Sequence, residues 1–285
     1  MFRLLNVNGR AALESDGGWY DLADLSGDSA MADPMVAVGR TGELHELQAR
    51  CAGATVGGSI DTAPLAAPVP VPRQVFGIGL NYCDHAGESG MELPSAPLTF
   101  TKFPSCVAGP TADVPLSSAT VDWEAEIVAV IGTECFGVAV DDAWSVVAGL
   151  TLGQDISDRG LQFTGNPAQF SLGKSFPAYA PIGPALVSVD AFADPDDIGL
   201  WCEVAGERMQ DARSSLLIFA IPTLVAYLSS ICTLYPGDLI FTGTPAGVGV
   251  ARGRFLATGE VIVTGAEVIG ELRNACVPGT GPLAV

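Results

Sequence analysis

The chain has 285 residues, of which 48% are hydrophobic, and its formal net charge is −19 from 32 acidic and 13 basic residues. This length can bury a sizeable core without disulfides or lipid. The acidity argues against a nucleic-acid partner, because phosphate binding requires clustered Lys and Arg. It also repels anions, so a carboxylate substrate would need local positive charge from a metal or from a few basic residues.

The cysteines and the N-terminal residues predict a cytoplasmic protein. Seven cysteines are scattered along the chain without a C-x-x-C pair, an odd set that is typical of reduced thiols and argues against a zinc cluster. Residues 1–5 meet the polar side chains of Asn6 and Asn8 too soon to form the apolar core of a signal peptide.

The N-terminal part is predicted to form a small domain. Residues 1–60 mix short apolar runs with Gly and Asp turns, which is typical of a β-rich unit with one or two helices, and they carry no recognisable chemistry. The run TAPLAAPVPVP at residues 62–72 holds four prolines and favours an extended, semi-rigid connector. We therefore expect a small N-terminal domain with its Pro-rich linker over residues 1–70 and a larger domain over residues 71–285.

The larger domain is predicted to be mostly β. A strand is expected at 75–80, a polar loop or short helix at 81–94, and a second strand at 124–131. Asp141 or Asp142 is expected to cap a short helix that ends at Val147. Further strands are expected at 150–155, 198–204, 238–242, 261–264 and 268–273. Short Gly-punctuated strands with few helices favour an α+β, mostly β architecture over a βαβ repeat.

One uncharged stretch, residues 214–237, is long enough to span a bilayer. Pro222 interrupts it, and it holds many Ser and Thr residues. These features favour a buried helix at 216–230, followed by a turn at Pro236-Gly237-Asp238. The sequence therefore predicts no membrane association.

Three carboxylates form a candidate metal site. Glu124 and Glu126 stand two apart in an expected strand, so both side chains point to the same face. The apolar run that follows them indicates a strand buried on both faces, where two like charges are costly unless a cation neutralises them. Asp155, at the end of the next strand, would complete an oxygen-only site for Mg²⁺ or Mn²⁺.

Only two histidines are present, and they are interpreted differently. His45, in the small domain, is expected to be structural or exposed. His85 is followed three residues later by Glu88, which on a helical turn would hold the imidazole in one tautomer and raise its basicity. Such a pair could deprotonate a water, although His and Glu three apart are common.

Five motifs occur in a fixed order and resemble the fumarylacetoacetate hydrolase family over about residues 75–277. They are GIGLNYCDHAGE (77–88), DWEAE (122–126), QDISDRGLQ (154–162), GKSF (173–176) and FTGTPAGVG (241–249). The resemblance implies a mixed β-sandwich roll, often dimeric, and hence a homodimer here.

The resemblance also implies a role for each matching residue. Glu124, Glu126 and Asp155 would hold the metal, and His85 with Glu88 would activate water on a lid. Lys174 and Gln162 would stabilise developing negative charge, Arg159 would bind the substrate carboxylate, and Thr244 would meet the ligand through its hydroxyl or amide.

Each of these residues also has a plainer interpretation. Lys174 could be a surface lysine, although basic residues are scarce in this chain. Arg159 could pair with Asp158, and Thr244 could cap a turn before Pro245.

The chain departs from the family pattern at Cys83, Gln154 and Ser157-Asp158-Arg159-Gly160. These positions leave the metal and dyad residues intact but leave the substrate open. Cys83 has no adjacent basic partner and is interpreted as a small lid residue and not as a nucleophile.

The resemblance specifies the site residues more closely than it specifies the reaction. The first expectation is a metal-dependent hydrolase that cleaves a carbon–carbon bond in a small acylpyruvate-like 1,3-dicarbonyl acid. The alternative is an oxaloacetate-type 2-oxo acid decarboxylase or isomerase that uses the same site. A non-catalytic relative that binds a metal or ligand is disfavoured, because His85, Glu88 and Lys174 are all present.

Overall fold

The structure is a computed structural model that describes residues 1–88 and 92–280; the side chains of Ala86 and Glu88 lie outside this description. The chain begins with antiparallel hairpins of β1 (Arg3–Val7), β2 (Arg10–Ser15) and β3 (Gly18–Asp21), with β4 (Gly58–Ser59) at the edge. Asn8-Gly9 and Asp16-Gly17 form the two-residue turns, a sequence choice that matches the twist of hairpin strands. The helices of this part are α1 (Leu22–Ser26), η1 (Ser29–Ala32), α2 (Pro34–Val38) and α3 (Thr41–Gln48).

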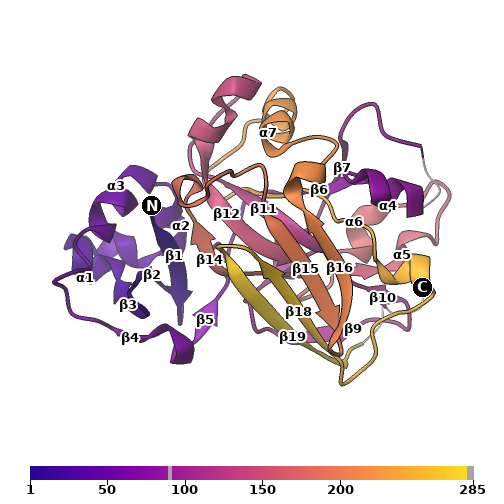
Figure 1. The fold of residues 1–285 in the computed structure, drawn as a ribbon, viewed down its shortest axis with the longest axis horizontal. Helices are drawn as coiled ribbons and strands as arrows, with labels where there is room; N and C mark the ends of the chain where they lie inside the picture. The colour runs from indigo at the N-terminus through magenta and orange to yellow at the C-terminus, as the bar shows by residue number, and fades with distance from the viewer. Residues whose placement is uncertain (89–91, 281–285) are drawn as a thin grey trace.

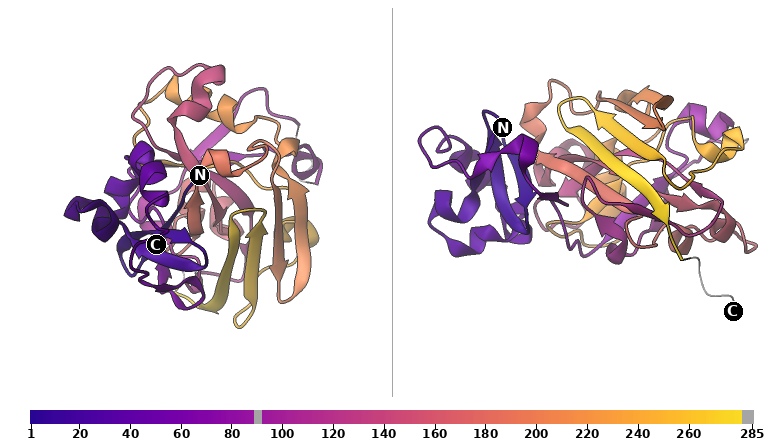
Figure 2. Two further views of the ribbon diagram at one scale, coloured as in Figure 1. Left: turned by 60° about the vertical axis from the view of Figure 1, so that its left-hand side comes forward. Right: turned by 90° about the horizontal axis from the view of Figure 1, so that it is seen from below.

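The N-terminal strands continue into the main sheet of the molecule (Figures 1 and 2). In the described residues its main path runs β4-β3-β2-β1-β14-β12-β11-β17-β6-β7. Its remaining members on this path are β14 (Ala180–Val187), β12 (Val147–Gln154), β11 (Ala125–Ile131), β17 (Leu239–Phe241), β6 (Val75–Gly79) and β7 (Leu98–Thr101). Because β1 pairs with β14, the sheet crosses the predicted boundary near residue 70, and the division into two domains stays a prediction.

The Pro-rich segment 62–72 contributes one short strand to this sheet. β5 (Leu65–Ala66) pairs with β1, after η2 (Ile60–Thr62). Elsewhere, β8 (Val107–Ala108) pairs with β14 and follows η3 (Pro104–Cys106).

A second sheet packs against the first and completes a sandwich (Figure 1). Its order is β16-β15-β18-β19-β9, and contacts join β15 to β11 and β18 to β12. Its strands are β9 (Val114–Leu116), β15 (Gly199–Val204), β16 (Glu207–Arg213), β18 (Val261–Ala266) and β19 (Gly270–Pro278). A short ladder pairs β10 (Val121–Asp122) with β13 (Ser157–Asp158). The predicted mostly β class is confirmed.

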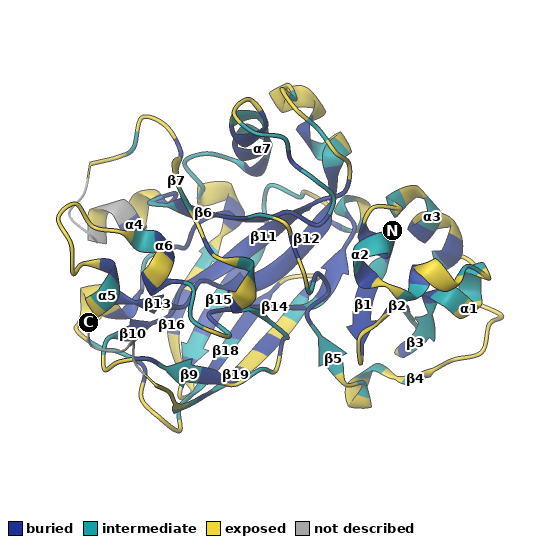
Figure 3. Ribbon diagram, turned by 180° about the vertical axis from the view of Figure 1, so that it is seen from behind, coloured by how far each residue is buried: buried dark blue, intermediate teal, exposed yellow. Residues whose placement is uncertain are grey.

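The core lies between the sheets, and β11 and β12 run through it with every residue buried (Figure 3). Their unbroken apolar runs are typical of strands covered on both faces. The strand predictions at 124–131 and 150–155 fall on these two elements.

Two helix predictions need correction. The expected helix at 216–230 begins only at Ile221, as α7 (Ile221–Ser229), because Pro222 is accepted in the first helical turn and not in the interior; η6 (Ser214–Leu216) precedes it. The segment near Asp141 is η4 (Val140–Val146), whose N-cap is Ala139 without a side-chain cap. No helix in the described ranges is long and apolar enough to cross a membrane.

The remaining helices are short and, apart from η5 (Val189–Ala191), they surround one end of the sandwich (Figure 1). They are α4 (Cys83–Glu88), α5 (Arg159–Gln162), α6 (Phe170–Gly173) and α8 (Gly249–Arg252). This end carries the candidate site.

Candidate active site

The register of β11 and β12 brings the three predicted carboxylates together. Ala125 pairs with Gln154, and the Asp155 amide donates to the Glu124 carbonyl over 2.9 Å. Glu124 therefore precedes β11 directly beside Asp155, and Glu126 lies two residues further along β11. Each of the three offers an oxygen within 4.8 Å of the other two, and all three residues are buried.

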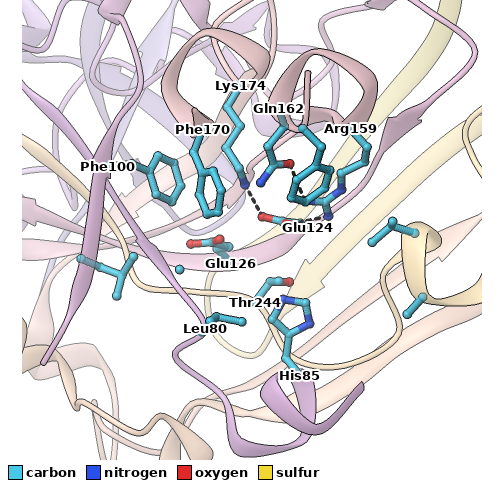
Figure 4. Close-up of a pocket in the computed structure, with 15 residues that line it drawn as sticks. Leu80, His85, Phe100, Glu124, Glu126, Arg159, Gln162, Phe170, Lys174 and Thr244 are labelled. Carbon is cyan, nitrogen blue, oxygen red and sulfur yellow. Dashed lines mark hydrogen bonds and ion pairs between the residues drawn. The ribbon is translucent and has the colours of Figure 1, made fainter. Parts of the chain in front are cut away.

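Buried cations contact two of these carboxylates. Lys174 Nζ bridges Glu124 Oε2 at 2.7 Å and Asp155 Oδ2 at 2.6 Å. Arg159 donates from Nη2 to Glu124 Oε1 at 2.6 Å (Figure 4) and from Nε to Asp122 Oδ2 at 2.8 Å. Neither plain interpretation holds, since Lys174 is 3% exposed and Arg159 pairs with carboxylates other than Asp158.

Lys102 belongs to the same cluster and was not predicted. Its Nζ contacts Asp155 Oδ1 and the Lys174 carbonyl, and its side chain is fully buried. The sequence contained the signal: Lys102 and Lys174 are its only two lysines. In a chain with so few basic residues, the scarcity that argued for Lys174 applied equally to Lys102.

Of the three carboxylates, Glu126 has the least neutralising positive charge around it. Burial opposes ionisation of Glu124, yet Lys174 and Arg159 hold its pKa below the usual range. Burial and the negative charges of Asp155 and Glu124 raise the pKa of Glu126 well above its usual range. The Glu126 carboxylate accepts from the Gly243 amide at 2.7 Å.

The carboxylates fit a divalent cation. Their oxygens lie within 4.8 Å of one another, so the three side chains could serve as ligands of one ion. The donor set is all oxygen, as these ions prefer. The raised pKa of Glu126 marks the position where added positive charge is most favourable.

A pocket of about 300 Å³ opens over the cluster (Figure 4). It is lined by all but one of the described candidate residues, namely His85, Glu124, Glu126, Arg159, Gln162, Lys174 and Thr244; Asp155 lies buried behind Lys174. His85 is buried in α4, and its proximity helps to lower the pKa of Glu124. The side chain of Glu88 lies outside the described part, so the predicted dyad stays a prediction.

Gln162 and Thr244 have structural partners in addition to the pocket. Gln162 Oε1 accepts from Arg159 Nη1 at 3.0 Å. The Thr244 hydroxyl donates to the Ala125 carbonyl at 2.9 Å and accepts from Gln210 Nε2 at 2.8 Å. The hydroxyl is thus occupied by these bonds and does not cap a turn, which leaves the Thr244 amide as the better ligand donor.

Polar residues outside the predicted set hold the site in shape. Gln154 Oε1 accepts from the Glu124 amide at 2.9 Å, and its Nε2 reaches Thr264 in the second sheet at 2.8 Å. At Gly243, with φ of 107°, a Cβ would lie 2.7 Å from the Asn81 Cβ, so only glycine fits where the amide meets Glu126.

Comparison with known proteins identifies the family of this chain. Residues 74–277 match the family described as fumarylacetoacetate (FAA) hydrolase C-terminal. This match covers well over half of the chain, and the chain belongs to that family.

Three relatives describe the range of the family. The human protein named oxaloacetate tautomerase FAHD2A, mitochondrial, is 40% identical over 215 residues, which cover 74% of this chain and 68% of the relative. A crystal structure of a candidate HpcE protein from Mycobacterium smegmatis is 43% identical, with a TM-score of 0.89 over 97% of this chain and 99% of the other. Maleylpyruvate hydrolase from Sphingobium sp. SYK-6, solved with manganese(II) and pyruvate, is 26% identical with a TM-score of 0.82 over 98% and 100%.

These likenesses confirm the predicted family, its fold and its enzymatic character. The protein is an enzyme of the fumarylacetoacetate hydrolase family, whose members here include a tautomerase and a hydrolase.

Proposed function

We propose that this enzyme interconverts the oxo and enol forms of a small 2-oxo acid with the help of Mg²⁺ or Mn²⁺. The observation that carries the proposal is the cluster of Glu124, Glu126 and Asp155 at the base of a pocket that also presents Lys174 and His85. The 40% identity to a protein named oxaloacetate tautomerase favours proton transfer over cleavage as the first candidate.

In this proposal Glu124, Glu126 and Asp155 hold the metal. When bound, the metal supplies Lewis-acid polarisation of the 2-oxo group. Arg159 binds the C1 carboxylate. Nε, Nη1 and Nη2 of Arg159 donate to Asp122, Gln162 and Glu124 in the described residues, and Nη2 also lies 2.8 Å from Asp122 Oδ2, which leaves the second N–H of Nη1 for the ligand. Gln162 and the Thr244 amide orient the acid.

Two side chains then transfer the proton and stabilise the negative charge. His85 removes a proton from C3, and the electron pair of the broken C–H bond forms the C2–C3 double bond while charge moves to the C2 oxygen. Lys174 stabilises that charge. Burial lowers the pKa of its ammonium group, but the neighbouring Asp155 and Glu124 carboxylates raise it above its usual value. Transfer of the C3 proton from His85 to the C2 oxygen gives the enol and restores the base, and Glu88 keeps His85 in the basic tautomer.

A second candidate is hydrolysis of an acylpyruvate, which the Sphingobium relative named maleylpyruvate hydrolase favours. Here His85 takes a proton from water, and the hydroxide adds to the distal carbonyl carbon. Lys174 and Gln162 stabilise the tetrahedral oxyanion. The C3–C4 bond then breaks, its electron pair remains with the pyruvate enolate, and transfer of the proton from His85 to C3 completes the reaction.

One panel of assays separates these reactions. Wild type, His85→Ala and Asp155→Asn are given Mn²⁺ and tested for loss of enol absorbance from oxaloacetate, pyruvate release from oxaloacetate, and pyruvate release from acetylpyruvate. The proposal predicts enol loss above the uncatalysed rate, abolished in both variants. Decarboxylation needs no base, so pyruvate release from oxaloacetate that survives in His85→Ala would make decarboxylation the reaction. Acetylpyruvate cleavage faster than enol loss would establish the hydrolase.

We also propose that the enzyme is a cytoplasmic homodimer. The family resemblance supports the dimer, and the cysteine pattern supports the compartment. Sedimentation of the metal-loaded protein tests the dimer, and a mass of one chain at micromolar concentration would overturn it.

A further inference from the structure

Aromatic side chains form one wall of the pocket beside the charged cluster. Phe100 of β7 and Phe170 of α6 meet edge to face with ring centroids 5.8 Å apart, and Phe163, just after α5, meets Phe170 at 6.3 Å. All three line the pocket. Figure 4 shows the rings of Phe100 and Phe170 next to Lys174, whose Nζ is 4.9 Å from the Phe100 centroid.

This row of rings, Phe100, Phe170 and Phe163, leads from the buried charges toward solvent. Phe100 and Phe170 are half-buried, whereas Phe163 is 50% exposed. Apolar side chains of β6, its following residue and α8 complete the lining: Ile78, Leu80, Val250 and Ala251. A ligand anchored at the carboxylates would therefore extend its distal group along an apolar surface.

The charges of the lining disfavour a second carboxylate on that group. Among the described lining residues, the permanent cations are Arg159 and Lys174, and both already contact carboxylates. Arg252 and Arg254, which follow the lining residue Val250, donate to the Met209 carbonyl and to Glu260. A distal carboxylate would lose water along the rings without gaining a cation of its own.

The net charge of the whole chain also disfavours a second carboxylate on the ligand. At a net charge of −19, a dianion is repelled more strongly than a monoanion of similar size. A ring on the ligand would instead add to the row in offset or edge-to-face contact.

We propose that the preferred substrate is a monocarboxylic 2-oxo acid with an apolar, aromatic or branched distal group, such as a 4-aryl-2,4-dioxobutanoate, and that Phe163 and Phe170 select it. This inference rests on the proposed function and specifies its substrate class. Oxaloacetate, with its second carboxylate, is expected to bind less tightly than such an acid.

The test compares two 2-oxo acids that differ only in the group on C4. Calorimetry with the Mn²⁺-loaded protein measures binding of 2-oxo-4-phenylbutanoate, whose C4 carries a phenyl ring, and of 2-oxoglutarate, whose C4 carries a carboxylate. We expect the phenyl acid to bind at least about tenfold more tightly, since contact with a protein ring corresponds to roughly 2- to 10-fold and the carboxylate is also penalised.

Two variants and a control attribute the preference to the rings. Phe163→Ala is expected to reduce it by roughly 2- to 10-fold, and Phe163→Arg to reverse it by supplying a cation. Phe136→Ala removes another exposed phenylalanine, 65% exposed and outside the pocket lining, and should leave both affinities unchanged.

The outcomes distinguish a failure of this inference from a failure of the proposed function. Equal or tighter binding of 2-oxoglutarate to the wild type would overturn the substrate class while leaving a 2-oxo acid enzyme. Binding of neither acid, together with no turnover of oxaloacetate or acetylpyruvate, would overturn the proposed function and this inference with it. A phenyl preference that Phe163→Arg does not change would remove Phe163 from the proposal.

Discussion

Replacing Lys102 by Met tests whether the buried cations hold the site together. Lys102 Nζ contacts Asp155 Oδ1 and the Lys174 carbonyl, so the variant leaves Asp155 buried with one cation fewer. Removal of one partner from a buried ion pair costs about 3–5 kcal/mol. For 285 residues the unfolding entropy is about 0.6 kcal/mol per kelvin, which converts that cost into a decrease in Tm of about 5–8 °C.

Differential scanning calorimetry of the metal-free protein measures this shift, and the chain offers a matched control. Arg213 also contacts two carboxylates, Asp197 and Glu267, but its side chain is 45% exposed. Because water screens exposed pairs, Arg213→Met should lower Tm by only a small fraction of the Lys102→Met shift. Saturating Mn²⁺ should restore more of the Tm in Lys102→Met than it adds to wild type, since it replaces a lost positive charge. Equal Tm decreases in the two variants would refute the argument from buried charge.

Two further predictions concern the metal and the charge that develops in the reaction. Glu126→Gln should stay folded but weaken Mn²⁺ binding by more than the roughly 10- to 100-fold typical of outer-shell changes. In wild type the raised pKa of Glu126 makes protons compete with metal, so Mn²⁺ affinity should increase from pH 6 to pH 8; titrations followed by electron paramagnetic resonance would contradict this if affinity were independent of pH. Lys174→Met should reduce kcat on the order of 100-fold while Mn²⁺ binding persists, and an unchanged kcat would restrict Lys174 to an ion-pair role.

Local pattern was sufficient to predict the central strands and the carboxylates. The apolar side chains that follow Glu126 require burial on both faces of the strand, and every residue of β11 is buried. Two carboxylates at the start of such a strand need a cation, and this reasoning led to Asp155 as the third ligand. The order of five motifs then identified the family, which the match over residues 74–277 confirmed.

Other features depended on contacts between residues far apart in sequence. Lys102 lies 53 residues before Asp155, and nothing in its neighbourhood shows that its ammonium turns inward. Arg159 could be assigned to Asp158 by proximity along the chain, whereas the fold directs it to Asp122 and Glu124. Pro222 indicated that α7 begins near Ile221, because proline is accepted in the first turn of a helix. The apolar composition of the stretch instead led to a prediction that began at residue 216.

The sequence by itself supplied the candidate residues of the site, because residue type and spacing indicate oxygen ligands, a base and scarce cations. Only the tertiary structure decided how their charges pair and which other side chains line the pocket with them. The β11–β12 register sets Glu124 beside Asp155, and the packing of α5, α6 and β7 aligns Phe163, Phe170 and Phe100. Such pairings arise from long-range packing and burial, and these determine which charges are neutralised and which surfaces remain for a ligand.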